Sequence, residues 1–229
     1  MNSVNSRNRG PAVSSPQNRT EIAVIGAGRV GQALGGRWRS LGYQVRYGVP
    51  DPTDERYSPL GAGQVALPSE VARNADVIVL AIPWEAAQAA CGLLGTVAGK
   101  IVIDCTNPVA MGPDGLTHAL GLASSAAEHI RDWCKGAYVF KTLNQTGFET
   151  MADPTRQAVK PVMFVAGDDA KNKEVVLGLV DALGFEAADA GPLTNARWLE
   201  AYALIWIDQV FKRGQSRSLA FALSRSKPD

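Results

Sequence analysis

One glycine-rich stretch near the N-terminus constrains the fold more than any other part of the chain. An apolar run at 22–25 is followed by Gly26, Gly28 and Gly31 in the spacing G-x-G-x-x-G, and residues 32–41 are expected to form a helix. In such a unit the first glycine permits a tight turn, the second lets a pyrophosphate approach the backbone, and the third lets the helix pack on the strand. The helix N-terminus adds N–H donors and the positive end of its dipole. The stretch predicts a dinucleotide-binding turn, with a ligand-free βα turn as the alternative.

Strands and helices are expected to alternate along the rest of the chain. Apolar runs predict strands at 43–47, 76–82, 100–104, 138–143, 161–166 and 185–188. Helical patterns occupy 67–74, 84–94, 122–133, 170–183 and 194–211, and loops are expected at 48–64 and 105–121. This alternation is typical of an α/β fold with a Rossmann-type doubly wound, mostly parallel sheet.

The chain divides into three parts by composition. Residues 1–20 are rich in Asn, Ser, Arg, Pro and Gly and are expected to be a disordered tail. Residues 21–190 would form the dinucleotide-binding Rossmann domain. Residues 191–229 would form a small C-terminal appendage of helix and tail, which packs on the cofactor crevice or forms a dimer interface.

Composition excludes several functional classes. A formal net charge of +1 over 229 residues favours neither nucleic acid nor an acidic membrane as partner. No apolar run is long enough for a transmembrane helix. Cys91, Cys105 and Cys134 lack metal-site spacing, so reduced thiols and a cytoplasmic location are expected. His118 and His129 fit no metal motif, and surface roles are expected for both.

The ligand crevice of a doubly wound sheet lies beyond the carboxyl ends of its strands. Ile82, Pro83 and Trp84 follow the third predicted strand, and Trp84 would lie beside the nicotinamide ribose or, alternatively, cap the core. Asn107 follows the fourth strand and suits a ribose or carboxamide, or an Asx turn before proline.

The fifth strand ends with two further candidates. Lys141 would hold a phosphate or carboxylate of the substrate, and Asn144 would face the reacting ring. Lys141 would act as a general acid only with a depressed pKa. The sequence offers no Ser/His/Asp or Cys/His constellation, so no catalytic residue is assigned. Hydride transfer between two stacked rings depends mainly on positioning. The pattern therefore favours an acceptor that is itself a cofactor.

The end of the second strand bears on the choice of nucleotide. An acid there favours the free ribose of NAD, and an arginine favours the 2′-phosphate of NADP. This strand runs out as Arg46-Tyr47-Gly48-Val49-Pro50-Asp51, with no acid at its end. Arg29 and Arg46 are candidate phosphate ligands or, alternatively, solvated surface charges. NADP is therefore favoured, with NAD as the alternative.

Several blocks resemble the NADPH-dependent F420 reductases and their relatives. These blocks are the glycine turn, Ala81-Ile82-Pro83-Trp84-Glu85, Gly167-Asp168-Asp169, and the run from Asp189 to Arg197. The Lys141-Thr142-Leu143-Asn144 segment looks more like the cytosolic NADPH:flavin domain of the STEAP metalloreductases.

The resemblance implies an oxidoreductase that passes a hydride between nicotinamide and a deazaflavin (F420) or flavin. It implies nucleotide contacts at Ala27, Gly28, Arg29, Val30, Val49, Pro50, Trp84 and Asn144. It also suggests substrate contacts at Pro192 and Leu193.

Two other functions remain open at this stage. One is an NAD(P)-dependent dehydrogenase or reductase of a hydroxy acid or imine, although few residues follow the last predicted strand for a large helical domain. The other is a dinucleotide-binding sensor without catalysis. In each case the partner would be a small molecule. The apolar helix from Trp198 to Phe211 also predicts a homodimer.

Overall fold

The computed structural model describes residues 20–113 and 115–226. Nearly all of the predicted disordered tail, residues 1–19, therefore lies outside the described part. The same part of the chain holds no helix with the length and apolarity that a membrane crossing requires.

An eight-stranded sheet forms the centre of the protein, in the order β10-β9-β8-β5-β4-β1-β2-β3. The strands are β1 (Glu21–Ile25), β2 (Gln44–Gly48), β3 (Val65–Ala66), β4 (Val77–Leu80), β5 (Ile101–Asp104), β8 (Tyr138–Lys141), β9 (Val162–Gly167) and β10 (Glu186–Asp189). Neighbouring strands are parallel except β8 and β9, which pair antiparallel. The Rossmann-type prediction is confirmed, and β9 and β10 run against the other six strands.

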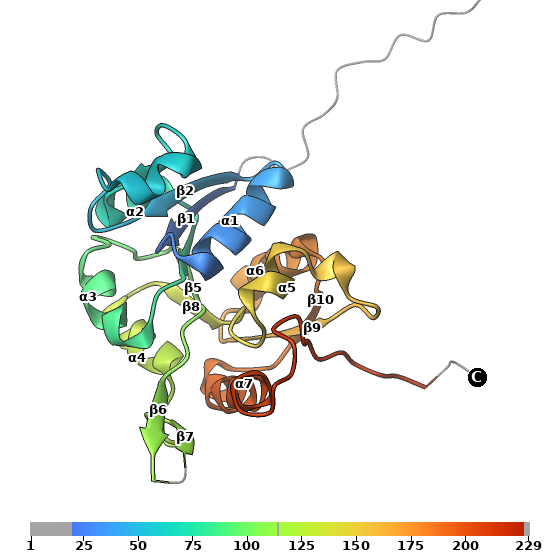
Figure 1. The fold of residues 1–229 in the computed structure, drawn as a ribbon. Helices are drawn as coiled ribbons and strands as arrows, with labels where there is room; N and C mark the ends of the chain where they lie inside the picture. The colour runs from blue at the N-terminus through green and yellow to red at the C-terminus, as the bar shows by residue number, and fades with distance from the viewer. Residues whose placement is uncertain (1–19, 114, 227–229) are drawn as a thin grey trace, which may run out of the picture.

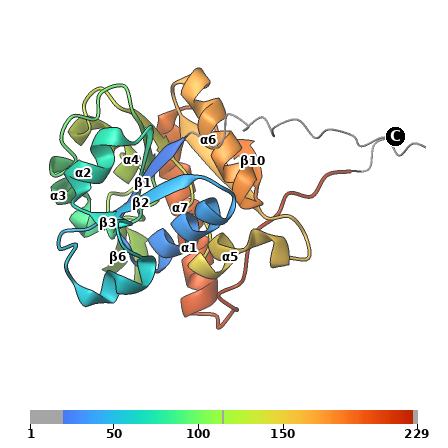
Figure 2. The ribbon, with the colours of Figure 1, turned by 90° about the horizontal axis from the view of Figure 1, so that it is seen from above.

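Helices cover both faces of the sheet, as Figures 1 and 2 show. The first face carries α1 (Arg29–Ser40), α5 (Phe148–Ala152) and α6 (Ala170–Leu183), and the second carries α2 (Pro68–Asn74), α3 (Ala87–Gly92) and α4 (Ala126–Trp133). Alternate residues of a strand supply the two cores: Val24 and Val79 face the first, and Ile25 and Leu80 face the second. Because both faces are covered, central strands such as β4 are apolar throughout.

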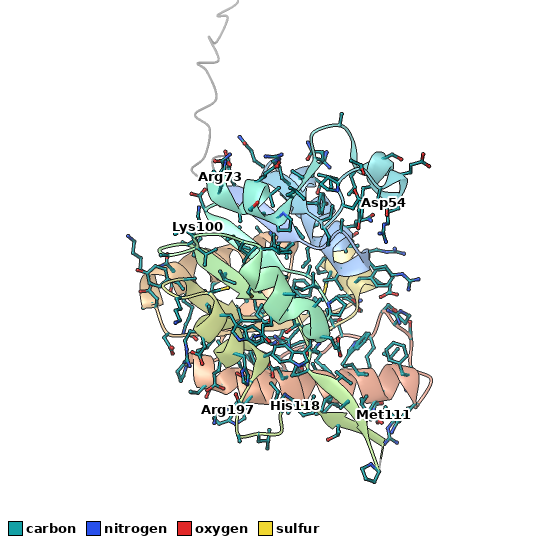
Figure 3. All side chains as sticks on the ribbon, turned by 90° about the vertical axis from the view of Figure 1, so that its left-hand side faces the viewer. Asp54, Arg73, Lys100, Met111, His118 and Arg197 are labelled. Atoms are coloured by element: carbon teal, nitrogen blue, oxygen red, sulfur yellow. The ribbon has the colours of Figure 1, made fainter. Side chains whose placement is uncertain are left out.

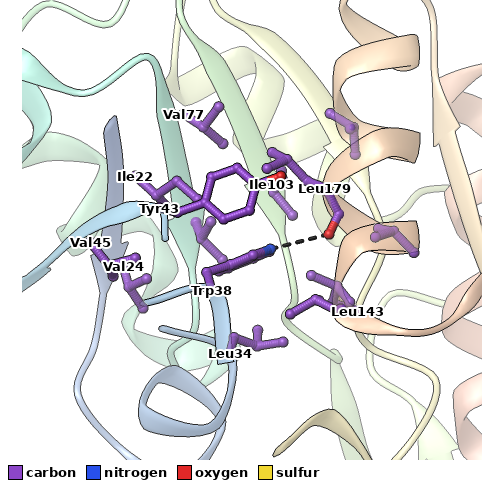
Figure 4. Packing of buried hydrophobic residues seen from close by; sticks show 14 of the residues in the cluster. Ile22, Val24, Leu34, Trp38, Tyr43, Val45, Val77, Ile103, Leu143 and Leu179 are labelled. Atoms are coloured by element: carbon purple, nitrogen blue, oxygen red, sulfur yellow. Dashed lines mark hydrogen bonds between the residues drawn. The ribbon is translucent and has the colours of Figure 1, made fainter. Parts of the chain in front are cut away.

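A buried tryptophan joins the two halves of the first face. Trp38 of α1 is fully buried, and its indole N–H donates to the carbonyl of Leu179 in α6 at 3.1 Å (Figure 4). Burial of such a large side chain is strongly favourable, and the polar N–H has the partner that burial requires. This contact holds α6, and with it β9 and β10, against the half of the protein that contains β1 and α1.

The C-terminal helix α7 (Ala196–Phe211) follows a short 3-10 turn, η5 (Leu193–Asn195). The segment after α7 continues along the protein, where the carbonyl of Leu219 accepts hydrogen bonds from Trp206 and Thr146. Figure 1 places α7 at the lower end of the sheet, beside a hairpin formed by β6 (Val109–Gly112) and β7 (Gly115–His118).

Several expected loops contain structure that their sequences did not indicate. The hairpin β6–β7 lies within the predicted loop at 105–121. The turn η2 (Glu55–Leu60) lies within the predicted loop at 48–64, and β3 follows that loop directly. The helix predicted from residue 122 begins at Ala126, because the Ser125 side chain caps its N-terminus. The helix predicted from Trp84 begins as a 3-10 turn, η3 (Trp84–Ala86), before α3. A further 3-10 turn, η4 (Pro154–Arg156), follows α5.

Candidate functional site

The glycine turn has the geometry that its sequence predicts. Gly26 has a φ of 97°, and a Cβ there would lie 2.6 Å from the carbonyl oxygen of Ala81. A Cβ on Gly31 would collide with the carbonyl oxygen of Gly26. Gly28, the residue before α1, differs, because no described atom would lie within 4 Å of its Cβ. Two glycines are thus required by crowding within the protein, and Gly28 faces open space.

The N-terminus of α1 opens toward this space. Its first turn holds no acidic residue, and no described side chain caps it. Its N–H groups and dipole therefore favour an anion. Arg29 is exposed there, and its guanidinium lies 5.6 Å from the centroid of the Phe148 ring. Ala27 is buried and Val30 half-buried, so both support the turn through packing.

The end of β2 offers less to a ligand than its sequence suggested. Val49 is 1% exposed, and its amide pairs with Ala66, so its side chain belongs to the core. Pro50 is exposed. Arg46 lines a hollow with residues from the amino ends of β1 and β2, away from the carboxyl ends of these strands. The Asp51 carboxylate accepts hydrogen bonds from the hydroxyl and the backbone N–H of Thr53, and these bonds lower the pKa of Asp51.

The segment after β4 lies against the glycine turn. Ile82 is half-buried, with its Cγ2 only 2.7 Å from the Cβ position of Gly26, and Pro83 is exposed. Trp84 is half-buried and stacks on Trp133 of α4, with 5.5 Å between ring centroids and an interplanar angle of 22°. This contact favours the packing role among the two that the sequence left open for Trp84.

Asn107 and Asn144, which come from the ends of β5 and β8, meet as a reciprocal pair. The Asn107 Nδ2 donates to the Asn144 carbonyl at 2.9 Å, and the Asn144 Nδ2 donates to the Asn107 Oδ1 at 3.0 Å. Leu143 precedes the pair with a φ of 57°, a conformation that leucine rarely adopts. Gln145 donates to the Asn144 Oδ1 and fixes the amide orientation. The structure thus brings these two predicted site residues together.

Lys141 does not present its charge to the crevice. The side chain is fully buried, and its Nζ contacts the Asp104 carboxylate at 2.8 Å, the Glu200 carboxylate at 2.9 Å, and the Thr106 carbonyl. Burial works to lower the pKa of Lys141, but the two carboxylates outweigh it and raise the pKa. The expectations of a substrate ligand or a general acid with a depressed pKa therefore need correction. Lys141 is a charged lysine committed to internal partners.

Glu200 connects this lysine to the hairpin and to α4. Its Oε2 accepts from the backbone N–H of Ala126 at 3.1 Å and lies 2.9 Å from the Nε2 of His118 (labelled in Figure 3). The His118 Nδ1 accepts from the Leu120 N–H, so its Nε2 carries the proton and donates to Glu200. The His118 side chain is 7% exposed, which corrects the surface role expected for it.

Burial also acts on Asp104, the second carboxylate beside Lys141. Burial raises the pKa of Asp104, and the ammonium of Lys141 opposes this effect. Both oxygens accept hydrogen bonds, one from Lys141 and one from the Thr106 N–H, which are the contacts of an ionised carboxylate. Asp104, Glu200 and His118 were missed from the sequence. Glu200 had one signal, because it is the single acid in the apolar run 196–207.

The structure places Pro192 and Leu193 away from this crevice. Because β9 runs against β8, Gly167 at its carboxyl end pairs with Phe140, and the chain then continues toward the amino end of β8. Leu193 is 1% exposed, and it borders a hollow with Tyr138, the first residue of β8. Pro192 is exposed beside it. The substrate role suggested for both residues therefore needs correction, since they lie at the opposite edge of the sheet.

Comparison with known proteins supports the fold and the nucleotide. The family of coenzyme F420-dependent NADP oxidoreductases matches residues 21–108. A structure from Arthrobacter sp. FB24, provisionally assigned as an F420-dependent NADP reductase, is 30% identical with a TM-score of 0.82. The match covers 90% of this chain and 100% of the Arthrobacter chain.

Two more distant relatives extend the comparison. The metalloreductase STEAP3 of Rattus norvegicus is 26% identical over 195 residues, which are 85% of this chain and 38% of the metalloreductase. The chain thus spans well under half of that curated relative. An imine reductase of Myxococcus stipitatus in complex with NADP+ is 17% identical with a TM-score of 0.64, and it covers 85% of this chain and 63% of its own. This last likeness shows the fold alone. The chain belongs to the family of coenzyme F420-dependent NADP oxidoreductases.

Proposed function

We propose that the crevice binds NADP(H), and that a hydride passes there between the nicotinamide and a deazaflavin (F420) or a flavin. The observation that carries the proposal is the contrast among the three glycines. Gly26 and Gly31 are crowded by the protein, whereas Gly28 opens on free space at an uncapped helix N-terminus. This is the place for a pyrophosphate in a dinucleotide fold.

Arg29 and the amide pair then have separate roles. Arg29 adds a positive charge beside the phosphate position, at the first residue of α1. Asn107 and Asn144 lie at the ends of β5 and β8, toward the nicotinamide end, and their fixed amides orient the ring. The bound nicotinamide supplies the hydride chemistry, and these residues hold its geometry.

The chemistry of the crevice favours a ring as the hydride acceptor. The basic groups behind the amide pair, Lys141 and His118, are bonded to internal partners. The polar side chains that pair at the ends of β5 and β8, Asn107 and Asn144, are amides. Reduction of an oxo acid or an imine calls for a placed proton donor, and the reverse oxidation of a hydroxy acid calls for a placed proton acceptor. Transfer between two ring cofactors depends on positioning instead. The family supports F420 as the acceptor, and the resemblance of residues 141–144 to a NADPH:flavin domain keeps a flavin as the second candidate.

The test is a parallel titration of the purified protein with NADPH and NADH, followed by turnover with F420 and with FMN. We expect saturable binding, with NADPH tighter than NADH, and turnover with one of the two acceptors. Tighter NADH binding would reverse the NADP preference. Binding without turnover on any acceptor would support a sensor without catalysis. Turnover only on imines with NADPH, or only on hydroxy acids with NADP+ as the oxidant, would support a dehydrogenase or reductase of those substrates.

We also propose that a second copy of the chain docks on α7. Trp198 and Ile205 are 65% and 52% exposed and lie seven residues apart, so they share one face of this helix. Ile205→Glu, or Leu204→Glu beside it, is expected to delay elution in gel filtration from the dimer to the monomer position. Val175→Glu on α6, which is 42% exposed, is the matched control. Unchanged elution of both α7 variants would count against this interface.

A further inference from the structure

A buried group of charges lies directly behind the Asn107–Asn144 pair. Lys141, Asp104 and Glu200 have side chains that are 0% exposed, and each comes from a different element, β8, β5 and α7. The Lys141 ammonium donates hydrogen bonds to the Asp104 carboxylate and to the carbonyl of Thr106, and it forms an ion pair with the Glu200 carboxylate.

This group of charges forms hydrogen bonds with the backbone of Thr106, the residue before Asn107. The Thr106 N–H donates to the Asp104 Oδ1 at 2.8 Å, and the Thr106 carbonyl accepts from Lys141. Thr106 is thus held at both of its backbone polar groups by one ion pair. Because Asn107 is the next residue, its position at the ends of the strands depends on these two hydrogen bonds.

The same group also reaches Asn144 through α7. The Asn144 Nδ2 donates to the carbonyl of Leu199 at 3.3 Å, and the next residue is Glu200, which contacts Lys141. Lys141 therefore stands between the two backbone segments that carry the amide pair.

Stability alone does not explain these charges. A buried ion pair often stabilises a protein no more than apolar residues of the same volume, because desolvation offsets the attraction. The group does provide a fixed orientation. We infer that Lys141 is a positioning residue, which sets the Asn107–Asn144 amides against the nicotinamide ring and thereby controls hydride transfer. This inference rests on the proposed function.

The first experiment compares Lys141→Met with Lys173→Met. Lys173 is also buried and ion-paired, to Asp189 at 2.8 Å, but it lies toward the opposite edge of the sheet. We expect Lys141→Met to lower kcat by about 10- to 100-fold, because small misplacements of reacting groups cost this much. The KM for NADPH is expected to stay within about 3-fold, because the phosphates bind at the distant glycine turn. Lys173→Met is expected to keep both constants.

A kcat for Lys141→Met equal to that of the wild type would overturn the inference while leaving the proposed function intact. If the wild type neither binds NADPH nor turns over, the proposed function itself fails. A matched fall of kcat in Lys173→Met would show a general loss of structure and would also overturn the inference.

A second measurement separates positioning from a merely structural role. A cycle of Lys141→Met, Asn107→Ala and the double variant is expected to be non-additive in kcat, because both changes act on one amide pair. Additive effects would contradict the inference. If Lys141→Met does not fold, the triple variant Lys141→Met/Asp104→Asn/Glu200→Gln leaves no unpaired charge and takes its place. That variant is expected to bind NADPH and to lose turnover, and wild-type turnover would contradict the inference.

Discussion

Replacing Gly28 by alanine separates ligand binding from folding. The residue has a φ of −77° and a ψ of −170°, which any amino acid adopts, and no described atom would lie within 4 Å of its Cβ. Alanine is a poorer residue than glycine before a helix, so the expected loss of stability is at most about 1 kcal/mol. For a chain of this size that is a fall of about 2–4 °C in Tm.

The same methyl group would occupy the space assigned to the pyrophosphate. Forcing an extra methyl group into a filled contact costs about 1–3 kcal/mol. At 1.4 kcal/mol for each tenfold change, NADPH binding by Gly28→Ala is expected to weaken about 5- to 150-fold.

Calorimetric titration with NADPH and thermal unfolding provide the assay, with Gly36→Ala as the control. Gly36 lies in the same helix α1, is exposed, and also has open space at its Cβ. Its replacement is expected to raise stability by about 0.5–1 kcal/mol and to leave the Kd unchanged. An unchanged Kd for Gly28→Ala would refute the assignment of the phosphate position.

Three further predictions concern folding. Gly31→Ala places a Cβ onto a backbone oxygen of its own turn, so we expect a loss of about 1–3 kcal/mol, and an unchanged Tm would contradict the crowding. Trp38→Phe removes the N–H that bonds Leu179 and leaves a void, for an expected loss of about 2–4 kcal/mol in urea unfolding; a neutral result would show that the bond contributes nothing. The hydrogen bonds from Arg197 hold the pKa of Glu128 below its ordinary value of 4.5. The ionised Glu128 therefore contributes its full stabilisation of the folded state above pH 4.5. That stabilisation is lost as the pH falls through the lower pKa of Glu128 in the folded protein. In Glu128→Gln, the free energy of unfolding is expected to fall less steeply as the pH is lowered below 4.5 than it does in the wild type. The same slope in both proteins would contradict this.

The sequence was sufficient for elements whose signals are local. The helix α6 has the predicted bounds, Ala170–Leu183, because Asp169 caps its start and Gly184 adopts the left-handed conformation at its end. The glycine turn is likewise local, since strand, turn and helix are contiguous. The order of the first strands follows from the usual right-handed crossovers of such a sheet.

Features that depend on partners far along the chain could not be predicted from the sequence. The apolar run of β9 does not indicate the direction of the strand, so its antiparallel pairing with β8 was not foreseen. For this reason Pro192 and Leu193 were expected beside the cofactor, although they lie toward the amino end of β8. Lys141 looked like a ligand because its partners were unknown. One of them, Glu200, lies 59 residues later, in α7. The hairpin β6–β7 forms in a loop rich in glycine and proline, where periodicity is weak.

The most direct test of the account is the oxidation of NADPH by this protein with F420 or FMN as acceptor, followed by the loss of NADPH absorbance. We expect saturable oxidation that depends on one of these ring acceptors, and weaker NADPH binding in Gly28→Ala than in Gly36→Ala. Failure to bind NADPH, or binding without hydride transfer to either acceptor, would contradict it.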